Sequence, residues 1–163
     1  MRNKELVIVF PIFDGVTEKF VLLGERLKNP WMNLFSGFGG NVEEGDKNSL
    51  QRQVIELYQE AKIIAKETDI VKKAEFVIDI KGKEPKLLHV YTVNEFSGKG
   101  ERTKEMRPEW FSFHNLPIHK MIRGDEFWVP RILAGEYLTG IIFRDAKLNF
   151  IDIEIRLSGS RFF

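Results

Sequence analysis

The chain has no cysteine, which excludes disulfide bonds and thiolate metal sites. Its formal net charge is only +1, and lysine and arginine are scattered without interleaved aromatic residues. This argues against a nucleic-acid polymer or an anionic membrane as a partner. Apolar runs such as residues 6–13 are too short to span a bilayer, and the N-terminal residues lack an apolar secretory core. We therefore expect a soluble, cytoplasmic protein.

The 163 residues show no repeat and no linker, and we expect one domain, 1–163. Apolar residues at helical spacing predict a long helix over residues 49–64 and a short one over residues 128–134. Runs rich in β-branched and aromatic residues predict strands at residues 6–13, 19–23, 74–80, 87–96, 109–113, 138–143 and 147–156, the last two joined by a turn at 144–146. Many strands with one helix in mid-chain and one late predict an α+β fold, a mixed sheet flanked by helices.

A glycine-rich segment, residues 37–46, leads directly into the long helix. Asn48 can cap that helix, and Gln51 three residues later completes a pattern like a capping box. Glu56 and Glu60 are four residues apart and therefore lie on one face of the helix. Such a pair alone usually forms a solvated face. Behind a glycine loop, it favours a hard divalent cation held against a phosphate chain.

Residues 40–63 resemble the Nudix box. Gly40 is followed six residues later by Asp46, and Glu56 and Glu60 match its closing acids if one extra residue is admitted after Asp46. Segments outside the box resemble the MutT-type branch, and in particular the animal oxidised-purine nucleoside triphosphatases: residues 21–24, 37–40, 105–111 and 127–130. The resemblance implies a Nudix fold, a mixed β-sheet sandwiched between α-helices. It also implies a Mg²⁺-dependent pyrophosphohydrolase, with Mn²⁺ as a substitute, that splits a nucleoside triphosphate into monophosphate and pyrophosphate.

The resemblance also assigns roles to individual residues. Glu56 and Glu60 would be catalytic, and the metal ligands would be these two, Glu105 and the carbonyl of Gly40. Trp31 lies beside Pro30 in a polar loop and is a candidate for stacking on a base. The small-molecule nucleotide would be bound by Arg26, Trp31, Ser36, Gly39 and Asp125. We expect Trp128 to be a core residue.

The chain also departs from the family pattern. Ile55 replaces the arginine that supports the acidic loop residue, Gln59 replaces a glutamate, and Lys62 replaces the glycine that ends the helix. Arg52, one turn before Glu56, could supply a substitute pairing.

The base pocket departs as well, because the family's asparagine, tryptophan and first aspartate correspond to Ser36, Ile122 and Gly124. An alternative therefore stays open: a catalytically attenuated or inactive Nudix-fold module that binds nucleotide or regulates. We favour the enzyme, because Glu56, Glu60 and Glu105 are retained.

Overall fold

The structure is a computed structural model that describes residues 4–157. Its strands and helices run along the chain in this order: β1 (Glu5–Asp14), β2 (Lys19–Arg26), β3 (Phe35–Ser36), β4 (Phe38–Asn41), α1 (Ser49–Ala61), the 3₁₀ turn η2 (Glu67–Asp69), β5 (Ile70–Ile80), β6 (Lys86–Val93), β7 (Met106–Ser112), the 3₁₀ turns η3 (Ile118–Lys120) and η4 (Asp125–Phe127), α2 (Val129–Leu133), β8 (Leu138–Arg144) and β9 (Phe150–Leu157).

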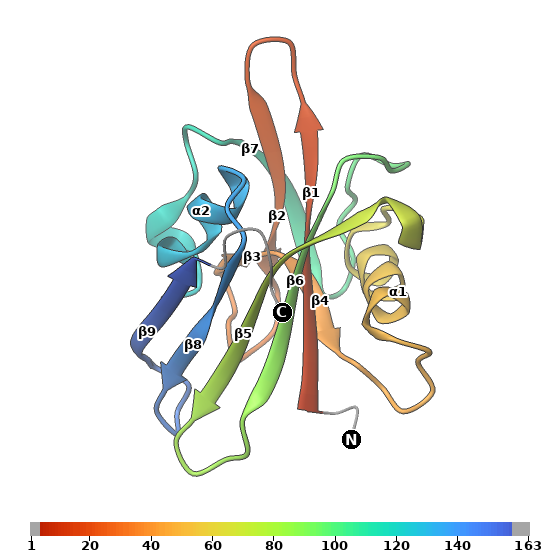
Figure 1. The fold of residues 1–163 in the computed structure, drawn as a ribbon. Coiled ribbons are helices and arrows are strands. Elements are labelled where there is room, and N and C mark those ends of the chain that lie inside the picture. Colours follow the sequence, from red (N-terminus) through yellow and green to blue (C-terminus); the bar gives the residue numbers. More distant parts are fainter. Residues whose placement is uncertain (1–3, 158–163) are drawn as a thin grey trace.

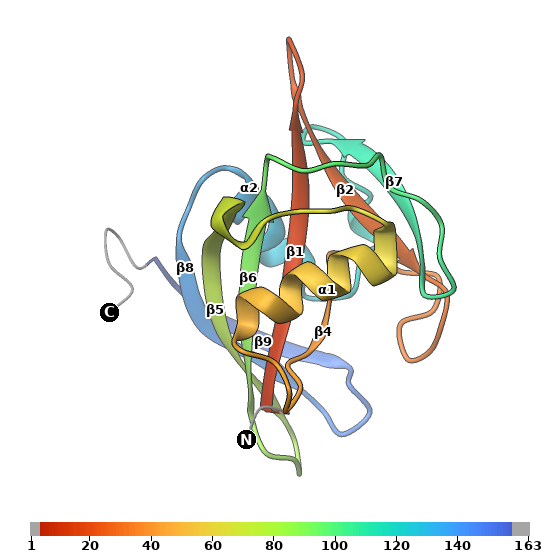
Figure 2. The same ribbon diagram turned by 90° about the vertical axis from the view of Figure 1, so that its right-hand side faces the viewer.

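The strands form one mixed sheet in the order β3-β2-β1-β6-β5-β8-β9, with β4 paired to β1 and β7 paired to β2 (Figure 1). The β1–β6 and β5–β8 pairs are parallel, and the other pairs are antiparallel. Helix α1 crosses one face of the sheet in front of β1, as Figure 2 shows, and α2 packs on the other face. The predicted mixed sheet flanked by helices is confirmed.

Strand β1 is apolar on both faces because it lies between the two cores. Val7 and Val9 belong to the core beneath α1, whereas Phe10 belongs to the core beneath α2. In the second core the Trp128 ring packs against Phe10 and Phe76, with ring centroids 6.0 and 5.3 Å apart. Trp128 is only 1% exposed, so its prediction as a core residue is confirmed.

The predicted end of the long helix, residue 64, is wrong. Helix α1 stops at Ala61 because Lys62 adopts a left-handed conformation with φ 58°, and its N–H donates to the carbonyl of Tyr58. This turn lets the chain continue in an extended form that buries Ile63 and pairs Ile64 with Ser97. Lysine therefore stands at a position that glycine usually occupies.

Two other segments differ from the prediction. Part of the glycine segment is strand β4 rather than loop, because Gly39 lets the backbones of β4 and β1 approach closely. A Cβ atom on Gly39 would lie 1.7 Å from the carbonyl oxygen of Val7. The turn predicted at 144–146 lies later: Asp145 accepts hydrogen bonds from the N–H groups of Lys147 and Asn149, so Arg144 belongs to β8.

Within residues 4–157, no helix is both long enough and apolar enough to cross a membrane.

Candidate active site

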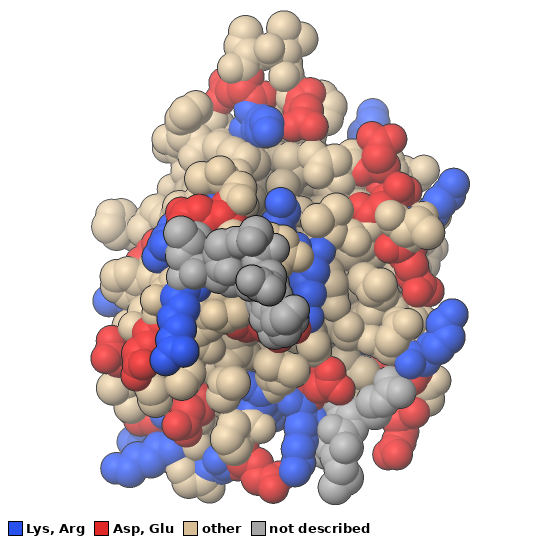
Figure 3. Space-filling view, viewed as in Figure 1, with Lys and Arg blue, Asp and Glu red and all other residues tan. Residues whose placement is uncertain are grey.

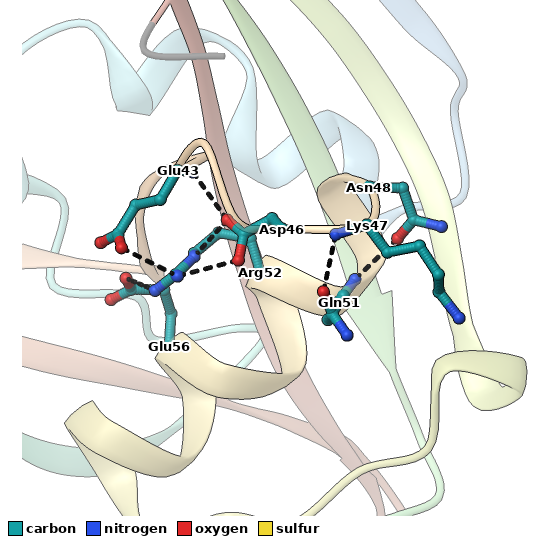
Figure 4. Close-up of polar contacts among 7 residues, drawn as sticks. All are labelled: Glu43, Asp46, Lys47, Asn48, Gln51, Arg52 and Glu56. Carbon is teal, nitrogen blue, oxygen red and sulfur yellow. Dashed lines mark hydrogen bonds and ion pairs between the residues drawn. The ribbon is translucent and has the colours of Figure 1, made fainter.

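The start of helix α1 is fixed by side chains of the preceding loop (Figure 4). The Oδ1 atom of Asn48 accepts a hydrogen bond from the N–H of Gln51 at 2.9 Å, and Gln51 Oε1 accepts one from the N–H of Lys47 at 2.7 Å. Asn48 is therefore the N-cap, as predicted. The cap sets the register of the helix and with it the direction in which Glu56 and Glu60 point.

A buried guanidinium joins the glycine loop to this helix. Arg52 contacts both carboxylate oxygens of Asp46, at 2.8 and 2.9 Å, and also lies 3.0 Å from Glu56 Oε2 and 3.3 Å from Glu43 Oε1 (Figure 4). Arg52 is 7% exposed and Asp46 6%. The hydrogen bonds that Arg52 donates to Asp46 in particular hold the pKa of Arg52 above its ordinary value, although burial opposes this. Arg52 thus provides the support for the acidic loop residue that Ile55 cannot provide.

Glu56 and Glu60 both face strand β4. Glu60 Oε1 accepts a hydrogen bond from the N–H of Gly39 at 2.8 Å. A Cβ atom on Gly40 would lie 2.8 Å from a carboxylate oxygen of Glu56, so a residue larger than glycine would occupy the space of that carboxylate. The structure thus brings together Gly39, Gly40, Glu56 and Glu60, as the sequence predicts.

The two carboxylates lie in an environment that disfavours their charges. Burial, and then the neighbouring charge of Glu56, raise the pKa of Glu60 to about 8, while the hydrogen bond from Gly39 opposes the shift. Burial also raises the pKa of Glu56, and its contact with Arg52 opposes this. A divalent cation between them would relieve both effects. The donor atoms therefore fit such a cation.

Glu105 stands at the edge of this group. It is exposed and forms an ion pair with Lys28, with Nζ and Oε1 3.0 Å apart. Its charge still contributes to the raised pKa values of Glu56 and Glu60. Within residues 4–157, no three acidic or histidine side chains converge into a ready-made metal cage. Two carboxylates with a backbone carbonyl instead suit Mg²⁺, which commonly takes its other ligands from water and substrate phosphates.

The other side of β4 opens into a cavity of about 460 Å³. Its floor is the apolar face of the sheet, including Leu6, Ile8 and Leu88. The five residues predicted to bind substrate all line it: Arg26, Trp31, Ser36, Gly39 and Asp125. Gly40 lines it as well, whereas Glu56, Glu60 and Glu105 do not. The glycine strand thus separates the carboxylate pair from a cavity within the size range of ligand sites.

Ser36 and Arg26 sit where the glycine strand begins. The Ser36 hydroxyl is buried and donates to the carbonyl of Gly37 at 2.9 Å, while Arg26 Nη1 lies 3.4 Å from the same hydroxyl oxygen. Arg26 Nε is buried and has no hydrogen-bond partner among the described residues. An unused cationic donor on the wall of the cavity suits an anionic ligand.

Asp125 is buried and lines the cavity. Burial raises its pKa to about 7, and the charge of Arg144 opposes the shift. The preceding residue, Gly124, has φ 108°, and a Cβ atom there would lie 2.7 Å from the ring of Phe150. The acidic side chain that the family pattern has at this position therefore has no room in this pocket.

Sequence reasoning missed Arg144, which is 7% exposed and lines the same cavity. Its guanidinium lies 5.1 Å from the centroid of the Trp31 ring and donates to the carbonyls of Leu148 at 3.2 Å and Arg123 at 3.0 Å. Lys83 and Lys86 from the β5–β6 hairpin also line the cavity and were not predicted. Asp145 and Asn149 are the residues from which the sequence could have revealed this. Their side chains are typical of a turn at residues 145–149, and a turn there places Arg144 in the preceding strand.

Comparison with known proteins gives a consistent result, although no family model matches the chain. The oxidized purine nucleoside triphosphate hydrolase of Mus musculus is 26% identical over 124 residues, 74% of this chain and 76% of that protein. The protein of the same name from Danio rerio is 27% identical over 138 residues, 85% of each chain. The crystal structure of the MutT protein from Bacillus halodurans superposes with a TM-score of 0.75 at 19% identity, covering 93% of this chain and 96% of that one. The predicted Nudix fold is confirmed.

Proposed function

We propose that the chain is a Nudix hydrolase of the MutT-like branch, a pyrophosphohydrolase that splits a nucleoside triphosphate into monophosphate and pyrophosphate; its Nudix fold and its likeness to oxidized purine nucleoside triphosphate hydrolases support this. One observation carries the proposal. The glycine strand β4 presents Gly39 and Gly40 to a nucleotide-sized cavity on one side and to Glu56 and Glu60 on the other. A nucleotide in the cavity would place its phosphate chain along these glycines, next to the carboxylates.

The hydrolase would use Mg²⁺, with Mn²⁺ as a substitute, held by Glu56, Glu60 and the carbonyl of Gly40. The charge of Glu105 raises the pKa values of both Glu56 and Glu60, and Glu105 would contribute to the same site. The cation would neutralise phosphate oxygens as their charge develops. Glu60, fixed by the N–H of Gly39, would orient the attacking water and accept its proton.

The remaining residues would hold the nucleotide. Arg26 would pair with phosphate, and Trp31 and Ser36 would contact the nucleoside. Asp125 is the retained member of the family's acidic pair, and its buried carboxyl would read the edge of the base. The relatives are named for oxidised purine nucleotides, and such a nucleotide is the first candidate here. Because Ser36, Ile122 and Gly124 differ from the family pattern, the base that this chain prefers would differ from the base that the relatives prefer.

A second candidate is a module that binds nucleotide but has lost turnover. The observation in its favour is Gln59, an exposed amide where the family pattern has a carboxylate. An amide offers a neutral oxygen and accepts no proton. Against this candidate stands Arg52, which restores the support of the acidic loop that Ile55 lacks.

The test is the release of pyrophosphate and phosphate from a panel of nucleotides, with Mg²⁺ and then with Mn²⁺. The panel holds normal and oxidised purine triphosphates, dinucleoside polyphosphates and nucleotide sugars. Glu60→Gln should lower the rate by about 10²–10⁴-fold. Glu95→Gln is the matched control, since Glu95 is exposed and lines neither the cavity nor the carboxylate pair. Nucleotide binding without turnover above the Glu60→Gln level would establish the second candidate.

A further inference from the structure

The cavity wall contains one guanidinium that has no role in the proposed site, that of Arg144. It stands at the end of strand β8, is 7% exposed, and lines the cavity. Its Nη1 atom donates to the carbonyl of Leu148 at 3.2 Å, and its Nη2 atom donates to the carbonyl of Arg123 at 3.0 Å. A guanidinium carries five N–H groups, so three of them have no acceptor among residues 4–157. Buried donors are normally paired, and a ligand that supplies acceptors would pair these.

The surroundings of Arg144 hold its guanidinium in one place. Besides the two carbonyls, the centroid of the Trp31 ring lies 5.1 Å from Arg144 Cζ and that of the Phe150 ring 6.0 Å. Among residues 4–157, no carboxylate lies within 4.0 Å of its nitrogen atoms. A fixed guanidinium presents parallel N–H groups, and this geometry matches a pair of adjacent acceptors.

The same guanidinium occupies a place where the family pattern has an acceptor. A Cβ atom on Gly124 would lie 3.5 Å from Arg144 Nη2, so the guanidinium fills the space into which a side chain at position 124 would project. The acid at the next position, Asp125, is retained. The charge of Arg144 opposes the rise in the pKa of Asp125, so the two groups are neighbours. The cavity therefore offers a fork of donors beside one carboxyl group.

The surface charge of the protein does not favour one nucleotide over another. The formal net charge is +1, and Figure 3 shows acidic and basic side chains interspersed over the face that it draws. Exposed charges are also screened by salt over about 10 Å, whereas buried ones are screened much less. The choice among nucleotides therefore depends on the hydrogen-bonding groups inside the cavity.

We propose that Arg144 recognises the base of the nucleotide, and that it selects a 6-oxopurine that is not oxidised at C8. The guanidinium would donate to O6 and N7, two neighbouring acceptors on one edge of guanine. Arginine commonly pairs with guanine through these two atoms. Asp125 would accept a hydrogen bond from N1–H, which is next to O6 on the ring.

The same contacts would reject other purines. Adenine has an amino group in place of O6, so a donor would face the donors of Arg144. A guanine that is oxidised at C8 carries a hydrogen on N7, and this also replaces an acceptor with a donor. The inference rests on the proposed function for the position of the nucleoside and deepens it by naming the base. It sets the oxidised purine nucleotide aside as the ligand, although the relatives are named for that class.

The experiment is a calorimetric titration of four nucleoside monophosphates without divalent metal: those of guanosine, 7-deazaguanosine, 8-oxoguanosine and adenosine. In 7-deazaguanosine a C–H group replaces N7, so this probe removes one acceptor while the protein stays unchanged. The wild-type chain should bind guanosine monophosphate about tenfold more tightly than each of the other three, as expected for a bidentate contact to O6 and N7.

Variants of the protein test the same contact from the other side. Arg144→Met removes the donors, and Arg144→Lys keeps the charge without the fork. Both should bring the four affinities to within about threefold of one another, because a single ammonium group cannot replace a bidentate contact. Arg156→Met is the matched control, since Arg156 is an exposed arginine of the neighbouring strand β9 and does not line the cavity. Thermal unfolding establishes that each variant is folded.

Several results would overturn the proposal. Equal binding of the guanosine and 8-oxoguanosine probes by the wild-type chain would do so without any variant, and so would equal binding of the 7-deazaguanosine probe. A folded Arg144→Met protein that keeps the wild-type order of affinities would also contradict it, as would loss of that order in Arg156→Met. Absence of binding for all four probes would contradict the position of the nucleoside in the cavity, and this inference with it.

Turnover is measured separately, with Mg²⁺ and the triphosphates of guanosine and 8-oxoguanosine. The expected order of binding without turnover would defeat the proposed hydrolysis and leave the role of Arg144 standing. Turnover that is faster with the oxidised nucleotide, together with tighter binding of its monophosphate, would defeat the role of Arg144 and leave the hydrolysis standing.

Discussion

Two arginines that are equally buried, Arg52 and Arg144, mark the two sides of the glycine strand. Arg52 contacts three carboxylates, so its charge is neutralised within the protein. Arg144 donates to two backbone carbonyls, lies over the Trp31 ring, and has no carboxylate within 4.0 Å among residues 4–157. Burial lowers the pKa of Arg144, whereas the contacts with Asp46 raise that of Arg52.

The difference separates a positioning role from a binding role. A guanidinium whose hydrogen bonds are directed at three carboxylates holds those groups in place. A guanidinium on a cavity wall that uses two of its five N–H groups can still donate to a ligand. We therefore expect loss of Arg52 to affect folding and the carboxylate pair, and loss of Arg144 to affect chiefly the choice of ligand.

The largest effect should come from Arg52→Met. Removing the cation leaves the buried Asp46 carboxylate without the Arg52 guanidinium, and breaking a buried ion pair in this way costs about 3–5 kcal/mol of unfolding free energy. Chemical denaturation measures this directly. The rate of hydrolysis should fall as well, because Glu56 loses the contact that orients it.

Returning a cation at the neighbouring helix position tests the same point. Residues 52 and 55 are three apart on α1, so Ile55→Arg added to Arg52→Met places a guanidinium on an adjoining part of the helix surface. Part of the lost stability and activity should return. A double variant no better than Arg52→Met would show that position 52 is required for more than its charge.

The next effect concerns the acid that faces Arg144. The folded-state pKa of Asp125, about 7, lies above its ordinary value of 3.8. Because the pKa is raised in the folded state, the unfolded chain releases this proton at a lower pH than the folded chain does. The contribution of the protonated carboxyl to the unfolding free energy is therefore fully present below about pH 4, and it is lost as the pH rises to about 7. Between these values the wild-type chain should lose about 4 kcal/mol of unfolding free energy relative to Asp125→Asn, whose amide does not titrate. Parallel stability profiles for the two proteins would contradict the burial of this carboxyl.

Arg144→Met should have a smaller effect on stability, about 1–2 kcal/mol, because two backbone carbonyls lose their donor while one desolvated charge is removed. The same change should raise the pKa of Asp125 further, since the charge of Arg144 is what opposes its shift. The relative affinities for a panel of nucleoside monophosphates should also change. A loss of stability as large as that of Arg52→Met, with the order of affinities unchanged, would remove the distinction between the two arginines.

The Arg52 side of the strand could largely be predicted from the sequence, because its contacts are local. Asn48 and Gln51 form the cap, and Arg52 precedes Glu56 by one helical turn, so spacing alone indicates both contacts. The glycines that face Glu56 and Glu60 could also be predicted, since the resemblance spans them. The fold class followed from the number of strands and the position of the helices.

On the Arg144 side, the resemblance indicated the five predicted substrate-binding residues, but the basic residues of the cavity wall could not be predicted, because their contacts are between segments far apart in the sequence. Arg144 meets Trp31, which lies more than a hundred residues earlier, and Lys83 and Lys86 reach the cavity only because the β5–β6 hairpin ends beside β4. A turn displaced by a few residues was enough to hide Arg144, since a residue assigned to a turn is expected to face solvent. Strand β4 was missed because glycine has low strand propensity, although pairing with β1 requires it here.

The smallest effect should come from Lys62→Gly, at a basic residue that is neither buried nor in contact with the site. Lys62 ends helix α1 with φ 58°, where a side chain is strained, and its ammonium group lies 4.7 Å from the centroid of the Tyr58 ring. Glycine should raise the unfolding free energy by about 0.5–1 kcal/mol, reduced by the loss of that ring contact. Thermal unfolding measures the gain, and the rate of hydrolysis should not change. A change in rate without a change in stability would mean that the end of the helix, and not only its first two turns around Arg52, positions Glu60.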